Sequence, residues 1–361
     1  MNLSRSPHII TIDETNQTET RIELFLWNTG SQPPNPQYTL SKKIPSSNNT
    51  ATYYNISPYT QEYYTFTTFQ NIYNVYDQAI STNFVVQYVV EKYKTVSGVE
   101  SSAGTESGEF MNGYGYYMEG QNPLNFTTVG LDEGTYLYNY DSSIAASQAN
   151  AMAGTMDVFF SDSNFFIRYT NLKTNVQTDI PFSTTGVRTF PRVHHTNLAD
   201  GNKTQLMRGS SVRWTATFKA QCEPKYQPVV IDFINKYGSW ARIFFQKAKT
   251  RNIQVNTDSY KANPASIPYT PTAQGQVREF NTTGTETIKL NTGWVNDGYA
   301  EYLQQLLLSE KVTLLDFETD TQYTPVNVKS KSLEKQTGLN NGMMNYSLDF
   351  EFAFDIINNV V

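Results

Sequence analysis

The chain has almost none of the residues from which metal centres and disulfide frameworks are built. Its 361 residues include one cysteine, Cys222, and three histidines, His8, His194 and His195. A single cysteine excludes an intramolecular disulfide, and there is no CxxC or Cys/His cluster with the spacing of a structural zinc site. We therefore expect packing and contacts between subunits to stabilise the fold, with no metal and no cofactor.

Long apolar runs and nucleotide-binding motifs are also missing. No stretch approaches the roughly 20 apolar residues of a membrane helix, and the polar start MNLSRSPHIITID lacks the core of a signal peptide. There is no Walker loop, GxGxxG or GxSxG motif. Charged residues make up only 17% of the chain, with a formal net charge of -6. These features predict a protein made in a cytoplasm, with no membrane insertion and no sequence-specific nucleic-acid binding.

Candidates for catalysis are few. The pair His194-His195 lies close to Asp200, but neighbouring side chains in an extended segment point to opposite faces, so a solvated loop is the better interpretation than a metal or catalytic site. Four carboxylates beside an aromatic-rich stretch would suit glycoside hydrolysis if two of them met in space. They are Glu109, Glu119, Asp132 and Glu133. Because the chain has 33 acidic residues, surface carboxylates are the default, and we predict that the protein is not an enzyme.

The chain is instead rich in residues that favour strands. Hydrophobic residues make up 39% and aromatic residues 14%, and Tyr, Phe, Thr and Val prefer pleated surfaces. In the first third, short strands recur about every ten residues between turns rich in Pro, Gly and Asn, which is typical of a β-sandwich. The strands are predicted over residues 9–12, 20–27, 38–44, 53–56 and 84–93. The Gly/Ser-rich stretch 97–108 is predicted to be a mobile loop.

Tyrosine and glycine are concentrated between residues 111 and 140. Exposed tyrosines among glycines can stack on sugars or fill pockets of a protein partner, whereas the alternative is that they pack on one face of a sheet. The candidate contact residues are Tyr114, Tyr116, Tyr117, Tyr136 and Tyr138. Residues 142–154 are rich in small side chains and fit either a short helix or a loop.

A second β-rich domain follows, with strands predicted over residues 156–160, 165–170 and 211–220. Residues 224–228 are interpreted as a hinge into a final module, where a hairpin turns at Gly238. That module continues with a strand at 285–290, a helix whose apolar face includes Tyr299, Tyr302 and Leu303, and a strand at 312–317.

Near the end of the sequence, residues Pro325 to Ile356 alternate between apolar and polar side chains and are predicted to form a hairpin. This hairpin is long enough to extend beyond its own domain. We predict that its exposed half pairs across a subunit boundary, because an unpaired strand edge invites association. The residues of this candidate inter-subunit hairpin are Val326, Val328, Tyr346, Leu348 and Phe350. The predicted fold class is mainly β, with β-sandwich-like domains at 1–122 and 123–222 and an α+β module at 223–361.

Several segments of the sequence resemble those of a known group of proteins. Residues 6–30 (SPHIITIDETNQTETRIELFLWNTG), 36–59, 233–245, 290–315 and 325–355 are similar to virion structural proteins of tailed phages of Bacteroidota, which include crAss-like phages. The closing hairpin also resembles the tail-tube fold of phage tubes, hubs and baseplates. In that fold, as the resemblance implies, a curled sheet with a flanking helix forms a ring with neighbouring copies.

The resemblance implies a structural component of the virion, made in the host bacterial cytoplasm, that forms a homo-oligomeric ring and contacts other tail or neck proteins. The two β-rich units ahead of the module are more than a minimal tube protein carries, which favours a tail hub, neck or baseplate subunit. The alternative is a receptor- or carbohydrate-binding tail adhesin that uses the Tyr/Gly-rich region.

Overall fold

The fold is built almost entirely from strands. The computed structural model describes the whole chain except residues 45–50, 67–73, 81, 120–128, 141–152, 161–163, 222–224, 264–274, 297, 317–322, 336–342 and 358–361. The helical elements in the described part are short: α1 (Ser57–Thr60), η1 (Gln61–Tyr63), η2 (Thr82–Phe84), η3 (Tyr117–Glu119), η4 (His195–Asn197) and α3 (Tyr299–Leu307). The prediction of a mainly β protein is therefore confirmed.

The chain divides into two compact units. Unit 1 comprises Met1–Cys222, Asp232–Ile243 and Leu308–Lys311, and unit 2 comprises Glu223–Ile231, Phe244–Leu307 and Val312–Val361. The expected boundary at residue 222 coincides with a boundary between these units. The expected boundary at residue 122 falls outside the described residues, and unit 1 contains both of the predicted sandwich-like domains.

The first part of unit 1 is a five-stranded sheet in the order β1-β8-β7-β3-β4 with a two-stranded sheet, β2-β5. The bounds are β1 (Asn2–Leu3), β2 (Ile9–Ile12), β3 (Gln17–Trp27), β4 (Tyr38–Lys43), β5 (Thr52–Asn55), β7 (Val85–Val96) and β8 (Val99–Met111). Side chains from both sheets, including Ile10, Ile22, Leu24 and Tyr54, form one buried core. The first five strands predicted from the alternation are thus present, each within a few residues of its expected bounds.

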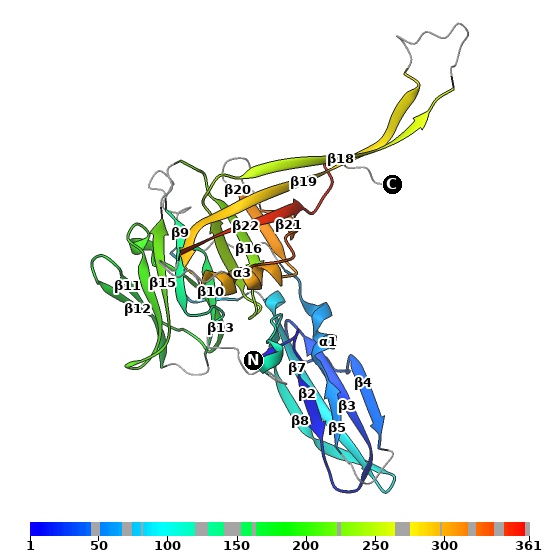
Figure 1. Cartoon of the computed structure of the whole chain (residues 1–361). Helices are drawn as coiled ribbons and strands as arrows, with labels where there is room; N and C mark the ends of the chain where they lie inside the picture. The colour runs from blue at the N-terminus through cyan, green and yellow to red at the C-terminus, as the bar shows by residue number, and fades with distance from the viewer. Residues whose placement is uncertain are drawn as a thin grey trace. The chain divides into compact units, whose positions relative to one another are not determined.

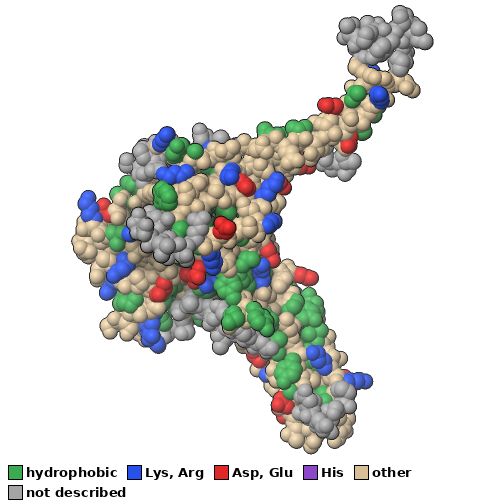
Figure 2. Space-filling view, viewed as in Figure 1, with side chains coloured by type: hydrophobic (Ala, Val, Ile, Leu, Met, Phe, Trp, Pro, Cys, Tyr) green, Lys and Arg blue, Asp and Glu red, His purple; other side chains and the backbone are tan. Residues whose placement is uncertain are grey.

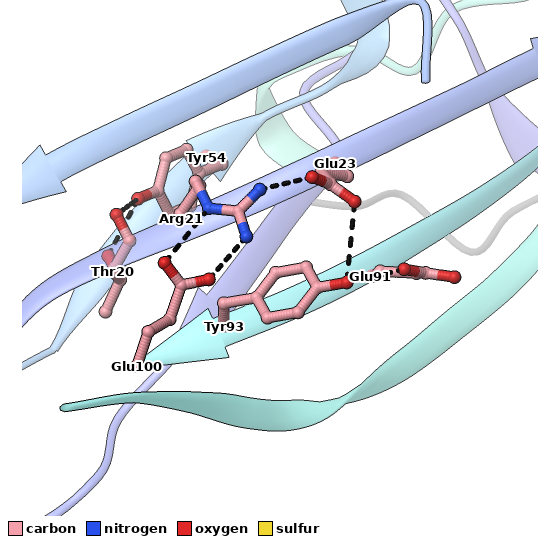
Figure 3. Close-up of polar contacts among 7 residues, drawn as sticks. All are labelled: Thr20, Arg21, Glu23, Tyr54, Glu91, Tyr93 and Glu100. Atoms are coloured by element: carbon pink, nitrogen blue, oxygen red, sulfur yellow. Dashed lines mark hydrogen bonds and ion pairs between the residues drawn. The ribbon is translucent and has the colours of Figure 1, made fainter. Parts of the chain in front are cut away.

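The prediction of a mobile loop at 97–108 is wrong, because this stretch is strand β8. Ser97 and Gly98 form the two-residue turn, with φ of 52° and 79°, as the right-handed twist of a hairpin requires. Figure 3 shows one reason that so polar a strand is held in place: Arg21 on β3 pairs with Glu23 and with Glu100 on β8. The Arg21 guanidinium also lies 4.2 Å from the ring centre of Tyr93 on β7. These contacts join three adjacent strands on their solvent face.

The second part of unit 1 contains two sheets, one of which includes a strand at residues 78–79, before the expected boundary at residue 122. Their orders are β12-β11-β14-β15-β9 and β10-β13-β6. The bounds are β6 (Gln78–Ala79), β9 (Gly134–Asn139), β10 (Thr155–Phe160), β11 (Phe165–Asn171), β12 (Gln177–Pro181), β13 (Gly186–Pro191), β14 (Asn202–Arg208) and β15 (Ser211–Gln221). All three predicted strands are found. The stretch 142–154, predicted as helix or loop, lies almost wholly outside the described residues.

The third large sheet has seven strands in the order β17-β16-β20-β21-β22-β19-β18. The bounds are β16 (Val229–Ile234), β17 (Trp240–Phe245), β18 (Thr250–Lys261), β19 (Val277–Asn296), β20 (Val312–Asp316), β21 (Thr324–Val328) and β22 (Met343–Phe352). Helix α3 is confirmed at the expected position, and its Tyr299, Tyr302, Leu303 and Leu306 are buried. The hairpin turn at Gly238 is also present, with a φ of 80°.

The prediction that the closing hairpin pairs with another subunit is wrong. Strand β21 pairs with β20 on one side and β22 on the other, and β22 pairs in turn with β19. Val326, Val328, Tyr346, Leu348 and Phe350 are all less than 9% exposed. The hairpin lies in the interior of the sheet because its alternating apolar residues fill the core, and the ladder satisfies its backbone on both sides. The strand also ends at Phe352, earlier than the expected Ile356.

Candidate assembly surface: an exposed two-stranded arm

The most exposed regular structure in unit 2 is the hairpin formed by β18 and the first half of β19, called here the arm (residues 250–261 and 277–286). All twelve residues of β18 are exposed, as are the first six of β19. At about 3.3 Å per residue, twelve residues span about 40 Å. Figure 1 shows the arm extending beyond the other strands of its sheet. A two-stranded hairpin is marginally stable at best in water, so the arm is an element that a partner would stabilise.

Apolar side chains lie along the arm in solvent. Ile253 and Val255 are each 59% exposed, and Val277 is 60% exposed. Further along the hairpin, the rings of Tyr260 and Phe280 meet edge to face at 5.6 Å. Figure 2 shows hydrophobic side chains along the arm among polar ones. Large apolar residues that gather on one exposed element, rather than singly, are typical of an interaction surface.

The apolar face of the arm continues the buried face of the sheet. Strand residues alternate between faces, and Ile253 lies opposite Glu286 while Val255 lies opposite Gly284. Residues 284 and 286 share a face with Ile288, which is fully buried. Ile253 and Val255 therefore continue the core face of the sheet. Ile356 packs against Gly284 on this face and leaves Ile253 and Val255 each 59% exposed.

A cluster of ionic contacts fixes the base of the arm. The carboxylate of Asp316, which is fully buried, accepts hydrogen bonds from Lys249 Nζ at 2.6 and 2.7 Å and from Arg251 Nη2 at 2.9 Å. Arg251 Nη1 also lies 3.2 Å from Glu286 Oε1, and its guanidinium lies 5.6 Å from the ring centre of Phe352. Burial alone would lower the pKa of Arg251, but the bond to Asp316 and the charge of Glu286 raise it overall. The arm thus leaves the sheet in a direction set by charged, partly buried contacts.

Two strand edges of the arm have no partner strand in the described part of the chain. β18 is the terminal strand of the sheet and pairs only with β19. On the other side, β22 pairs with β19 no further than Thr287, after which the Ile356 amide donates to Gly284 O at 2.8 Å. Beyond Gly284 the β19 edge pairs with no other described strand. Such edges are templates for pairing with another chain.

The pattern of apolar and polar residues did not predict this arm. Residues 250–261 carry only scattered apolar side chains among Thr, Asn, Asp and Lys, so the period-two signal that reveals a strand with one buried face is weak there. Ile253 and Val255 are two residues apart, but Tyr260 falls on the opposite face, and a strand exposed on both faces has no need of strict alternation.

Most of the predicted tyrosine contact surface is buried in unit 1. Tyr114, Tyr136 and Tyr138 are at most 8% exposed, and the hydroxyl of Tyr138 donates to Leu198 O at 2.5 Å. Tyr116 is partly buried. Tyr117 alone among the five is fully in solvent, at 97% exposure. The packing interpretation is therefore correct for Tyr114, Tyr136 and Tyr138, and a shared contact face made of all five is ruled out.

The histidine pair is part of an aromatic cluster. His194 is buried, and its ring stacks 5.2 Å from that of Tyr76, whose hydroxyl lies 2.9 Å from His195 Nδ1. Burial, with a smaller contribution from His195, lowers the pKa of His194 to about 4. Within the described residues, no group of three or more His, Cys, Asp or Glu side chains could hold a metal ion. The predicted solvated loop is wrong for His194, which is a packed and neutral side chain.

Two of the four carboxylates considered for hydrolysis, Asp132 and Glu133, have structural partners. Asp132 accepts from the Tyr237 hydroxyl at 2.5 Å and pairs with Lys236 Nζ at 3.0 Å. Glu133 Oε1 accepts from the Thr215 amide at 3.0 Å. Glu109 lies in β8, and the side chain of Glu119 is outside the described residues.

No protein-family model matches the chain, and no curated protein is significantly similar to it. In the described portion, no helix has both the length and the apolar character needed to span a membrane.

Proposed function

We propose that the protein is a structural subunit of a tailed-phage virion, a ring-forming hub, neck or baseplate component that performs no chemistry. The arm of unit 2 carries this proposal, because it combines unpaired strand edges with an exposed apolar face. The resemblance of residues 6–30, 36–59, 233–245, 290–315 and 325–355 to virion proteins of Bacteroidota phages supports the same role. Neighbouring copies of the chain and other tail proteins are the proposed partners, and the virion is the proposed location.

The size of the arm is adequate for a specific contact between copies. A ribbon about 40 Å long and two strands wide, about 10 Å, can bury on the order of 800 Å² when one face and one edge are covered. That area matches what one partner contributes to a standard interface. Ile253, Val255 and Val277, which lie on the same face of the arm, would supply its apolar centre, with charged residues such as Lys261 and Glu279 at the rim.

The proposal is tested by the particles that the purified protein forms. We expect the full chain to form closed rings, seen by negative-stain microscopy and as a discrete high mass by light scattering, with more rings at higher concentration. The variant Ile253→Ser/Val255→Ser/Val277→Ser should remain folded, because these side chains are in solvent, yet lose ring formation.

A matched control removes comparable apolar surface elsewhere. Val176 and Val212 of unit 1 are 62% and 50% exposed, so Val176→Ser/Val212→Ser should leave the rings intact. A wild-type protein that stays monomeric at high concentration, or rings that survive the arm variant, would refute assembly through the arm.

A further inference from the structure

A groove in unit 1 lies between two strand edges. It has a volume of about 330 Å³ and is lined by Thr39, Leu40, Ser41 and Lys42 of β4, by Tyr54 and Asn55 of β5, and by Tyr59. This volume is at the lower end of the range for ligand sites. β4 is the terminal strand of its sheet and pairs only with β3, while β5 pairs only with β2. The groove therefore lies where two sheets of the sandwich each end.

The backbone hydrogen-bond pattern shows which polar groups of β4 face the groove. In an antiparallel pair, only every second residue directs its N–H and C=O to the partner strand. The Ile44 amide donates to Thr18 O at 2.9 Å. With Leu40 opposite Ile22 and Lys42 opposite Thr20, this alternation turns the backbone of Thr39 and Ser41 away from β3, toward the groove.

The same reasoning applies to β5. The Ile56 amide donates to His8 O at 3.1 Å, and Tyr54 lies opposite Ile10. The backbone groups of Tyr53 and Asn55 therefore point away from β2, toward β4. Lys42 Nζ confirms this direction, because it reaches across and donates to Tyr53 O. The β4 wall thus presents the backbone donors and acceptors of Thr39 and Ser41. The β5 wall presents those of Asn55, while the Tyr53 carbonyl already accepts from Lys42.

The side chains around the groove combine aromatic surface with one positive charge. Tyr38 and Tyr59 pack with ring centres 4.6 Å apart, and Lys42 Nζ lies 5.0 Å from the ring centre of Tyr54. Figure 2 shows hydrophobic side chains gathered over the region of α1 and β4. Lys42 is the one charged residue among the described residues that line the groove.

We propose that this groove binds an extended polypeptide segment of a partner protein, which adds as a strand to β4 and places a carboxylate beside Lys42. Main-chain hydrogen bonds to an exposed sheet edge give affinity, and pockets for alternate side chains give specificity. The tyrosines would contact an apolar side chain of the bound segment. An extended peptide is favoured over a sugar because the polar groups here are strand backbone at the spacing of a ladder, which a peptide matches along its length.

The test uses the full chain and a displayed library of randomised peptides, followed by fluorescence anisotropy with the enriched peptide in synthetic form. Ser41→Pro removes the one backbone donor at Ser41 that points into the groove, and proline is tolerated at such a position of an edge strand. We expect it to weaken binding about tenfold or more. The control Ser41→Ala keeps the amide and should bind as the wild type does.

A second measurement does not depend on how the variant folds. Methylation of alternate backbone nitrogens of the enriched peptide should abolish its binding to the wild-type protein, and Lys42→Met should remove the preference for an acidic residue. Failure to enrich any peptide, equal binding by Ser41→Pro and wild type, or displacement by a panel of hexose oligosaccharides would overturn the proposal, the last in favour of a glycan site. Because the groove is remote in sequence from the arm, Ser41→Pro should form the same particles as the wild type, so this test is independent of the proposed assembly.

Discussion

Replacing Asp316 by asparagine tests whether a buried carboxylate holds the base of the arm. Asparagine preserves the shape of the side chain and removes its negative charge. Asp316 accepts three hydrogen bonds from two cations, Lys249 and Arg251, and is itself fully buried. The substitution leaves both cations without their common counter-ion.

The loss of stability in Asp316→Asn depends on how exposed Lys249 and Arg251 are. Hydrogen bonds to charged groups contribute about 1.5–3 kcal/mol each, and loss of one partner from a fully buried pair costs about 3–5 kcal/mol. Lys249 and Arg251 are 17% and 31% exposed, so water recovers part of their lost solvation, and Arg251 retains Glu286. We therefore expect a destabilisation of about 2–4 kcal/mol.

Native-state hydrogen exchange measures this loss where it occurs. At about 1.4 kcal/mol per factor of ten, protection of the amides at the base of β18 and in the facing part of β19 should fall roughly 30- to 1000-fold. Amides of the first sheet of unit 1 should be unaffected, because Lys249 and Arg251, the two cations that bind Asp316, both lie in unit 2.

The matched control is Glu351→Gln in the same sheet. Glu351 Oε2 lies 3.0 Å from Lys329 Nζ, but these side chains are 35% and 48% exposed. An exposed pair contributes about 0–1 kcal/mol, so this variant should change protection little. If Asp316→Asn and Glu351→Gln have equally small effects, the reasoning that burial gives the Asp316 cluster its strength is refuted.

Two further predictions concern charged and titratable groups inside unit 1. The pKa of His194 is lowered to about 4, against about 6.5 in an unfolded chain. Below pH 6.5 the unfolded chain therefore binds a proton that the folded chain does not. The free energy of unfolding should fall by about 1–3 kcal/mol as the pH drops from 6.5 to 4. Urea unfolding at several pH values checks this, and His194→Gln should flatten that part of the profile; an unchanged profile would contradict it. Asp232 and Arg242 form a fully buried pair with two bonds of 2.7 Å. Asp232→Asn should cost about 3–5 kcal/mol, and the double variant Asp232→Leu/Arg242→Met should recover most of it; a stable single variant would show that the Arg242 charge is otherwise compensated.

The alternation of apolar and polar residues predicted most of the strands in the core. The period of two at Met344 to Phe352 reappears as alternate buried and exposed positions, and the helical spacing of Tyr299, Tyr302 and Leu303 reappears as the buried face of α3. These elements were predictable because a strand or helix with one buried face must repeat its apolar residues at the period of its backbone.

By itself, then, the sequence determined that the chain is mainly β, where its half-buried strands lie, and that it lacks the residues of a disulfide framework or a zinc cluster. Only the tertiary structure decided which strands lie inside a sheet and which lie at an edge. From its sequence the closing hairpin is a candidate for an exposed edge, yet it is enclosed between β19 and β20. The polar β18 is instead one of the two terminal strands of the described sheet. The physical reason is that backbone hydrogen bonds between segments far apart in the chain determine which strands are neighbours. Because every residue type makes these bonds, they produce no recognisable pattern in the amino-acid sequence.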